Sequence, residues 1–338
     1  MLPYIGSHLL DTLVKRGAQV RIVDDLSSGE LKNIADHVMN GRLEFVERGL
    51  REPLVADQVV KGIDVVFHLA SDRGGRGSCD LHQAACATNL LLDGTVFRAC
   101  YQAGVGKVVY ASSARVYPSH LQTDPSKMFY LREDMVGPPY DADNLYGWSK
   151  LMGEMTLRVY TKEWGMRSVS CRYFTVDGPR GVENHAVMAM IAHAFVRQTP
   201  FVIWGTGERI RNWAYIDDIV HGTIFAAEHI DDGSAVNLGT MERIRVLDAA
   251  KEVLRYLNHP APIKLHPEMR AGPYNRVADN SLAKMLMGWQ PAGKFTEGVR
   301  RTIDWDLSTK TPEQVSALLE TIVAKRQVAA NVHNIGSV

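Results

Sequence analysis

The chain has 338 residues, 46% of them hydrophobic and 22% charged, and its 38 basic residues are balanced by 38 acidic ones. The length suits one large domain plus a smaller one, and the absent basic surplus argues against nucleic acid or an anionic membrane as a partner. No apolar run approaches the roughly 20 residues that span a bilayer. The four cysteines lack metal-site spacing, so we expect reduced thiols, no bound metal and a cytoplasmic protein.

The first predicted elements are a helix and a strand that ends in acids. Apolar residues recur at helical spacing from about Gly6 to Arg16, and an apolar run then leads through residues 19–23 to Asp24 and Asp25. In a dinucleotide-binding α/β unit, an acid at this strand end receives the adenosine ribose hydroxyls. Such an acid would repel a 2′-phosphate, so Asp24 favours NAD over NADP. The alternative is that the two acids only begin a turn.

A dinucleotide-binding unit also needs a strand and a glycine-rich turn before its first helix. Here only three residues precede Tyr4, so the first strand is apparently missing. Gly6 corresponds to the last glycine of the turn, and we expect Ile5 and Gly6 to contact the cofactor. Pro3 occupies the preceding glycine position, where its fixed φ and missing N–H cannot replace glycine. Either the true start lies upstream, or the cofactor cradle is incomplete.

Strands and helices then alternate, which predicts an α/β fold with a doubly wound parallel sheet and a ligand at the carboxyl ends of the strands. The loop after His68 and the hydroxyl of Ser113 both occupy such ends. The expected strands cover residues 43–46, 63–70 and 107–114, and the expected helices cover residues 54–60, 82–102 and 146–164.

Tyr146 and Lys150 stand four residues apart, so they share one face of the last of these helices. A tyrosine alone is a poor base at neutral pH, and an ammonium fixed nearby favours the phenolate. The pair can exchange a proton with a sugar hydroxyl when a hydride acceptor lies alongside. The spacing alone is a weak signal, since a helix surface with a half-buried aromatic produces it too.

Many short motifs in order give a stronger signal. Together they resemble the extended short-chain dehydrogenase/reductase family, in the order and spacing of its NAD-dependent nucleotide-sugar epimerases and dehydratases, over about nine-tenths of the chain. The motifs are Val23-Asp24-Asp25-Leu26, His68-Leu69-Ala70, Ala111 to Tyr117, Tyr146-Gly147-Trp148-Ser149-Lys150, Arg172-Tyr173-Phe174, Gly178-Pro179, Tyr215-Ile216-Asp217-Asp218, Asn237-Leu238-Gly239 and Gly288-Trp289.

The resemblance implies a role for each part of the site. Tyr146 would be the acid/base, Lys150 would bind the nicotinamide ribose, and Ser113 would hydrogen-bond the sugar hydroxyl. Further cofactor contacts are expected from Leu69, Ala70 and Asn89. The substrate would be a nucleotide-diphosphate sugar. Its diphosphate is expected on Arg211 and Arg276, because the arginine fork binds such groups bidentately.

Within the family, the segment from Ala70 to Gly77 is most similar to the GDP-mannose 3,5-epimerase branch, so Arg73 and Gly75 are expected to contact the sugar. Two positions depart from that branch. Arg115 stands where its cysteine would be, and His185 lies where its lysine would be.

Arginine cannot act as a base, whereas histidine could carry a proton. Thr175 replaces an asparagine frequent in 4-epimerases, so a UDP-hexose 4-epimerase, of the UDP-glucose or UDP-glucuronate type, stays open beside the 3,5-epimerase.

We expect an NAD-binding domain over residues 1–171, a nucleotide-sugar domain over residues 172–327 with an interleaved boundary, and a flexible tail over residues 328–338. The resemblance also implies a homodimer through the helices at residues 82–102 and 146–164. Two other readings are a one-way dehydrogenase and a non-catalytic member with a truncated N-terminus.

Overall fold

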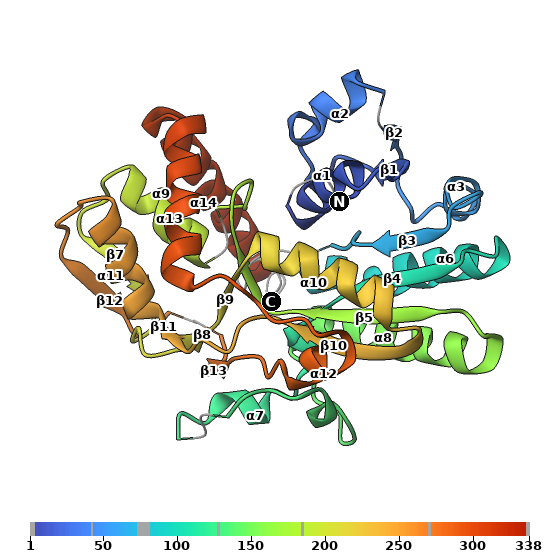
Figure 1. The fold of residues 1–338 in the computed structure, drawn as a ribbon. Helices are drawn as coiled ribbons and strands as arrows, with labels where there is room; N and C mark the ends of the chain where they lie inside the picture. The colour runs from blue at the N-terminus through green and yellow to red at the C-terminus, as the bar shows by residue number, and fades with distance from the viewer. Residues whose placement is uncertain are drawn as a thin grey trace.

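The computed structural model describes residues 4–41, 43–72, 82–126, 129–183, 186–269 and 272–335. Its first half alternates strands with helices (Figure 1). The elements in this half are α1 (Ile5–Lys15), β1 (Val20–Asp24), η1 (Leu31–Asn33), α2 (Ala35–Met39), β2 (Leu43–Glu47), α3 (Pro53–Val59), β3 (Val65–His68), α5 (Gln83–Ala87), α6 (Asn89–Gln102), β4 (Lys107–Ser113), η2 (Ala114–Val116), α7 (His120–Thr123), η3 (Glu133–Met135), α8 (Asn144–Trp164) and β5 (Ser168–Tyr173).

The strands are parallel, as expected, but they form two separate sheets. One has the order β10-β5-β4-β3, where β10 (Asp232–Leu238) comes from late in the chain, and the other is the pair β1-β2. Figure 1 shows β1 and β2 set apart above β3. Among the described residues no strand joins β1 to β3. The architecture is Rossmann-like.

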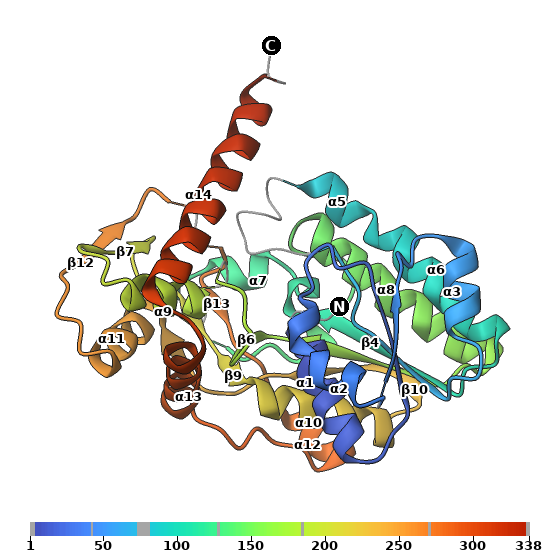
Figure 2. The same ribbon diagram turned by 90° about the horizontal axis from the view of Figure 1, so that it is seen from above.

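Helices cover both faces of the four-stranded sheet (Figure 2). On one face α3, α6 and α8 bury a core that includes Leu92, Phe97 and Leu157. On the other, α10 (Ile216–His229) and α12 (Ser281–Met287) pack against the strands, and α1 packs on α10. A sheet buried on both faces requires near-continuous apolar strands, which explains the runs that made these strands visible in the sequence.

The helix expected over residues 82–102 is interrupted at Thr88, between α5 and α6. The Thr88 hydroxyl is 2.7 Å from the Ala85 carbonyl and 3.0 Å from the Asp72 carboxylate, and the Asn89 side chain also turns to Asp72. Polar side chains that bond outside the helix compete with its backbone ladder. Sequence periodicity could not reveal this break, because it depends on a contact with another segment.

The second half forms a smaller unit with its own core of Val187, Ile191, Phe201, Trp213 and Val299. In this half β7 pairs with β12, β8 lies between β11 and β13, and β6 pairs with β9. Its remaining elements are β6 (Thr175–Asp177), α9 (Ala186–Phe195), β7 (Phe201–Trp204), β8 (Ile210–Arg211), β9 (Trp213–Tyr215), β11 (Ile244–Arg245), α11 (Val246–Tyr256), β12 (Ile263–His266), β13 (Asn275–Arg276), α13 (Phe295–Thr309) and α14 (Pro312–Ile335).

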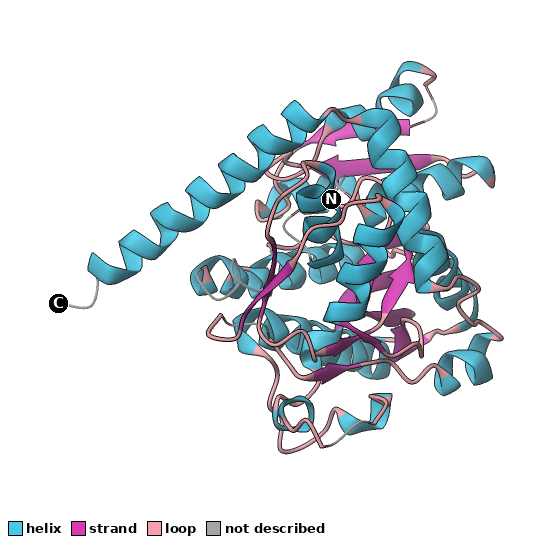
Figure 3. Ribbon diagram, turned by 90° about the vertical axis from the view of Figure 1, so that its left-hand side faces the viewer, coloured by secondary structure: helices cyan, strands magenta, loops and turns pink. Residues whose placement is uncertain are grey.

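The chain end differs from the expected loose tail. Most of residues 328–338 continue α14, which runs to Ile335 and extends away from the rest of the chain (Figures 2 and 3). The segment lacks apolar periodicity, but residues 313–335 contain neither proline nor glycine. The sequence therefore has no residue that would stop the helix before Ile335.

Two other sequence expectations concern thiols and membranes. Cys86, Cys100 and Cys171 are free and buried, whereas Cys79 lies outside the described residues. Burial raises the pKa of the Cys100 and Cys171 thiols to about 12, so both stay protonated and unreactive at neutral pH. No helix in the described part of the chain is long and apolar enough to cross a membrane.

Asp177, at the end of β6, is a buried acid, and no described side chain pairs with either of its carboxyl oxygens. Burial raises the pKa of the Asp177 carboxyl well above its ordinary value, and the nearby Asp218 and Glu242 raise it further. Because the pKa of Asp177 is higher in the folded than in the unfolded protein, the protein is most stable at a pH below the unfolded-state pKa. Its stability declines as the pH rises toward the folded-state pKa.

We therefore expect Asp177→Asn to raise the melting temperature at pH 7, by on the order of 2–4 °C for each kcal/mol regained. Near about pH 4, the unfolded-state value of aspartate, the variant and the natural protein should melt together. Thermal unfolding across this range, with Asp64→Asn at an exposed position as the control, checks the expectation. A variant less stable than the natural protein at pH 7 would contradict it.

Candidate active site

The site lies at the carboxyl ends of the parallel strands, where the sequence places it. Ser113 is the last residue of β4, and Ala70 follows β3. Directly after Ser113 the chain turns through η2, and the Ser113 hydroxyl oxygen accepts the Arg115 backbone N–H at 3.2 Å. That bond uses a lone pair and leaves the hydroxyl hydrogen of Ser113 available to a ligand.

Helix α8 begins against this turn. The Asp143 N–H donates to the Arg115 carbonyl at 2.9 Å, and the Asn144 side-chain oxygen accepts the Tyr146 N–H at 3.0 Å. A Cβ on Gly147 would lie 2.4 Å from the Arg115 carbonyl oxygen, so only glycine permits the approach. The glycine after Tyr146 therefore lets the tyrosine helix contact the Ser113 turn.

Below Tyr146 on the same helix face lies Lys150, whose side chain is 1% exposed. Its Nζ is 5.9 Å from the centroid of the Tyr146 ring and 4.6 Å from that of Tyr110, a cation–π arrangement. No described residue accepts a hydrogen bond from this Nζ. A buried ammonium without an acceptor is costly unless a bound group supplies one.

Buried hydrogen bonds hold the Tyr110 side chain in place. Its hydroxyl donates to the Asp93 carboxylate at 2.5 Å, and the other Asp93 oxygen is 2.8 Å from His68 Nε2, all three residues being buried. Burial, followed by the Asp93 charge, raises the pKa of Tyr110 well above its usual value, so it remains a neutral donor. This buried triad holds the ring on which the Lys150 ammonium rests.

One turn beyond Lys150, Glu154 continues the same face of α8, a residue that the sequence analysis did not single out. It forms a buried fork with Arg172 of β5, with Nη2 to Oε2 at 2.8 Å and Nε to Oε1 at 3.0 Å. The two side chains are 1% and 2% exposed. The repeat of polar residues at 146, 150 and 154 was the available signal. This pair attaches the catalytic face of α8 to the sheet.

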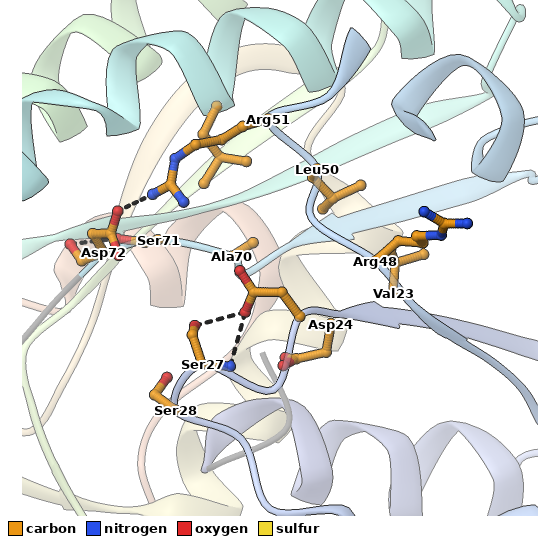
Figure 4. Close-up of a pocket in the computed structure, with 12 residues that line it drawn as sticks. Val23, Asp24, Ser27, Ser28, Arg48, Leu50, Arg51, Ala70, Ser71 and Asp72 are labelled. Carbon is orange, nitrogen blue, oxygen red and sulfur yellow. Dashed lines mark hydrogen bonds and ion pairs between the residues drawn. The ribbon is translucent and has the colours of Figure 1, made fainter. Parts of the chain in front are cut away.

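A pocket at the ends of β1 and β3 lies where the adenosine end of the cofactor is expected (Figure 4). Asp24 lines it, is 8% exposed, and accepts the Leu26 N–H at 2.8 Å. Ala70 also lines the pocket, whereas Leu69 packs into the apolar core and Ile5 and Gly6 form the first turn of α1. Its lining residues are Val23, Asp24, Asp25, Ser27, Ser28, Arg48, Leu50, Arg51, Ala70, Ser71, Asp72 and Leu92.

Asn89 is fully buried and supports the pocket rather than lining it. Its Oδ1 accepts the Asp72 N–H at 2.7 Å, and its Nδ2 donates to the Asp72 carbonyl at 3.0 Å. The Asp72 carboxylate forms an ion pair with Arg51 (Figure 4). Arg48 and Arg51 were missed in the sequence, although Arg48 follows directly after the strand that ends at Glu47 and Arg51 lies in the same loop.

The two arginines expected at a diphosphate lie on β8 and β13, which are adjacent strands. Arg211 donates to the Ile210 and Pro273 carbonyls, both at 2.7 Å. Arg276 donates to the Asp143 carboxylate at 3.0 Å and to the Gln122 side chain at 2.6 Å. Asp143 directly precedes α8, so Arg276 connects the smaller unit to the start of the Tyr146 helix.

Arg115 and Thr175 complete the described part of the expected set. The Arg115 guanidinium lies 5.5 Å from the Tyr146 ring centroid, and Thr175 begins β6, half-buried, just beyond the end of β5. Three other expected residues, Arg73, Gly75 and His185, lie outside the residues that the structure describes.

Residues 3–239 match the model of the NAD dependent epimerase/dehydratase family. The chain belongs to this family. A Bacillus subtilis strain 168 protein named as an uncharacterized UDP-glucose epimerase is 30% identical over 311 residues, 89% of this chain and 94% of that one. GDP-mannose 3,5-epimerase 1 of rice, Oryza sativa subsp. japonica, is 28% identical over 307 residues, 89% of this chain and 79% of that one.

Among solved structures of family members, the UDP-glucuronic acid 4-epimerase of Bacillus cereus, in complex with UDP-glucuronic acid and NAD, superposes with a TM-score of 0.80. It is 27% identical, with 90% of this chain and 96% of that chain covered. The family assignment and the NAD expectation of the sequence analysis are thereby confirmed.

The residues present fit NAD. The unpaired Lys150 ammonium offers a buried donor for a ribose hydroxyl beside Tyr146, and the Asp24 carboxylate offers an acceptor for the adenosine ribose. The Lys150 ammonium could therefore bind the nicotinamide ribose of NAD, and the Asp24 carboxylate could bind its adenosine ribose.

We expect Lys150→Met to weaken NAD binding by roughly 10- to 100-fold, the usual value of a hydrogen bond from a charged donor. The same change should raise the melting temperature of the cofactor-free protein, because it removes a buried, unpaired charge. Calorimetric titration with NAD and thermal unfolding without it measure both effects. Lys162→Met, at an exposed position of the same helix, is the control. Unchanged NAD affinity would exclude Lys150 from the cofactor site.

Proposed function

We propose that the protein is an NAD-dependent nucleotide-sugar epimerase that inverts a carbon of the sugar by transient oxidation at C4. One observation carries the proposal: a buried ammonium, with no acceptor among the residues that the structure describes, lies on the Tyr146 face of α8. This helix packs against the turn that holds Ser113. This arrangement combines a proton carrier, a hydrogen-bond donor and a cofactor contact at one strand edge.

In the proposed reaction the sugar C4 hydroxyl lies between Tyr146 and Ser113. Ser113 donates its free hydroxyl hydrogen to O4 and orients it. Tyr146, as phenolate, removes the O4 proton while the C4–H bond breaks. Lys150 and Asp24 would hold NAD, which would supply the acceptor for the C4 hydrogen with its electron pair and the donor for its return. The keto-sugar turns over in the site, and Tyr146 then protonates O4 of the inverted product.

Inversion at C4 is favoured over inversion at C3 and C5. The motifs and the 28% identical rice GDP-mannose 3,5-epimerase support the second reaction. That reaction needs a further base beside C3 or C5. Arg115, which stands beside Tyr146, cannot serve as one, and His185, the other candidate, lies outside the described residues. C4 inversion requires only Tyr146, Ser113 and Lys150 from this chain.

The test is turnover of UDP-glucose, UDP-glucuronate and GDP-mannose with catalytic NAD. An epimerase gives an isomeric product and no net reduced cofactor. Accumulating reduced cofactor would indicate the one-way dehydrogenase instead. Absence of NAD binding and of turnover with all three sugars would support the non-catalytic alternative.

We also propose that the protein is a homodimer through α6 and α8, which lie side by side (Figure 2). Both helices expose large apolar side chains that a partner would cover, and exposed apolar patches of this size mark interaction sites. These are Leu90, Leu91, Tyr101, Leu145, Trp148, Met152, Val159 and Trp164.

Leu91→Glu is expected to convert a dimer to a monomer, since it places a charge in a buried apolar interface. Leu91 is 59% exposed in the single chain. Light scattering after size exclusion measures the mass, with Met285→Glu, at a 72% exposed position of α12, as the control. Equal masses for the natural protein and Leu91→Glu would reject this interface.

A further inference from the structure

Arg115 carries a positive charge beside the reacting centre that nothing in the described chain neutralises. Its guanidinium carbon is 5.5 Å from the Tyr146 ring centroid. Its Nη1 is buried and has no acceptor among the described residues, and the ion pairs of this part of the chain do not include it. Arg115 as a whole is half-buried, but a buried donor left without an acceptor is costly, so the site is more complete with an anion than without one.

The backbone of Arg115 cannot easily move away. Its N–H donates to the Ser113 hydroxyl oxygen at 3.2 Å, and its carbonyl accepts the Asp143 N–H at 2.9 Å. The same carbonyl contacts Gly147, where a Cβ would lie only 2.4 Å away. Arg115 is therefore held between the residue that orients the sugar hydroxyl and the helix that carries the proton donor.

The other anionic groups of the two ligands are expected elsewhere. The diphosphate of the nucleotide sugar belongs with Arg211 and Arg276, on β8 and β13 of the smaller unit. The NAD diphosphate joins the adenosine ribose, expected in the pocket at the ends of β1 and β3, to the nicotinamide ribose, expected at Lys150. The anion that Arg115 meets must then be part of the sugar itself.

Resting on the proposed function, we infer that Arg115 binds a carboxylate on the sugar, so that the preferred substrates are nucleotide hexuronates. If C4 lies between Ser113 and Tyr146, the ring atoms nearest to Arg115 are C3 and C5. C3 carries a hydroxyl, whereas C5 carries C6, the one neighbouring carbon that can be a carboxylate. A guanidinium fork pairs with a carboxylate through two parallel hydrogen bonds, which a single hydroxyl cannot offer.

The test compares UDP-glucuronate with UDP-glucose, which differ only at C6. The measured quantity is the ratio of their kcat/KM values for the NAD-loaded natural protein, Arg115→Met and Arg115→Lys. Arg132→Met is the control, because Arg132 is exposed and pairs with its neighbour Asp134. We expect the natural protein and the control to prefer UDP-glucuronate by roughly 10- to 100-fold. Arg115→Met should lose this preference and Arg115→Lys should retain part of it.

The same comparison is made by calorimetric titration of both sugar nucleotides into the NAD-loaded proteins, so the inference is tested even without turnover. Equal or weaker use and binding of UDP-glucuronate by the natural protein would overturn it, as would an Arg115→Met variant that keeps the preference. Failure of the proposed function has a different outcome: neither sugar is epimerised, while selective, Arg115-dependent binding of UDP-glucuronate persists. NAD titration of Arg115→Met verifies that the variant folds.

Discussion

Tyr146→Phe is expected to lower turnover by at least about a hundredfold, the usual scale of a lost acid/base catalyst. The change removes one hydroxyl and leaves the ring that lies near Lys150 and Arg115. Cofactor and substrate binding should therefore stay within a few-fold of the natural values. Steady-state kinetics and NAD titration separate the two effects.

The matched control is Tyr140→Phe, which alters an exposed tyrosine on the loop before α8. It should turn over substrate at the natural rate. If Tyr146→Phe retained near-normal turnover, the proton carrier would have to be another residue, and the proposed mechanism would be wrong.

The largest effect on stability is expected from Glu154→Gln, at about 3–5 kcal/mol, the typical cost of removing one partner of a buried ion pair. Glu154 and Arg172 are 1% and 2% exposed, so water cannot replace the lost partner. Burial lowers the pKa of Arg172 and the adjacent Glu154 carboxylate raises it. Glu154→Gln removes the second influence, but a guanidinium keeps its proton in proteins, so an unpaired buried charge remains. Urea unfolding of the cofactor-free protein measures the loss.

An exposed pair supplies the comparison. Glu228, bound to Arg16 at 2.6 Å, is 47% exposed, and Glu228→Gln should change the unfolding free energy by less than about 1 kcal/mol. Equal losses for the two variants would show that the buried fork does not stabilise α8 on the sheet. Glu154 shares its helix face with Tyr146 and Lys150. Glu154→Gln should therefore also lower turnover, because loss of the buried pair disturbs the positions of those two side chains.

Local pattern was enough to place the strands, most helices and the residues at the strand ends. Apolar runs ending in Asp24 and Ser113 reveal buried parallel strands, and the Tyr146–Lys150 spacing follows from helical geometry.

Pairings over long sequence distances were not readable. Arg276 meets Asp143 across 133 positions, and no periodicity reports such a contact. For the same reason the sequence did not reveal that Asn89 holds the Asp72 loop beside the pocket. The unpaired state of Lys150 and Arg115 could be recognised only after the fold had placed every described neighbour.

The most direct test of the account is the position of deuterium in product formed in heavy water with catalytic NAD. If Tyr146 and the cofactor carry out oxidation and reduction at C4, the C4 hydrogen never exchanges with solvent. The product should then be inverted at C4 and contain no carbon-bound deuterium. Deuterium at C3 or C5, or a product not inverted at C4, would contradict the account.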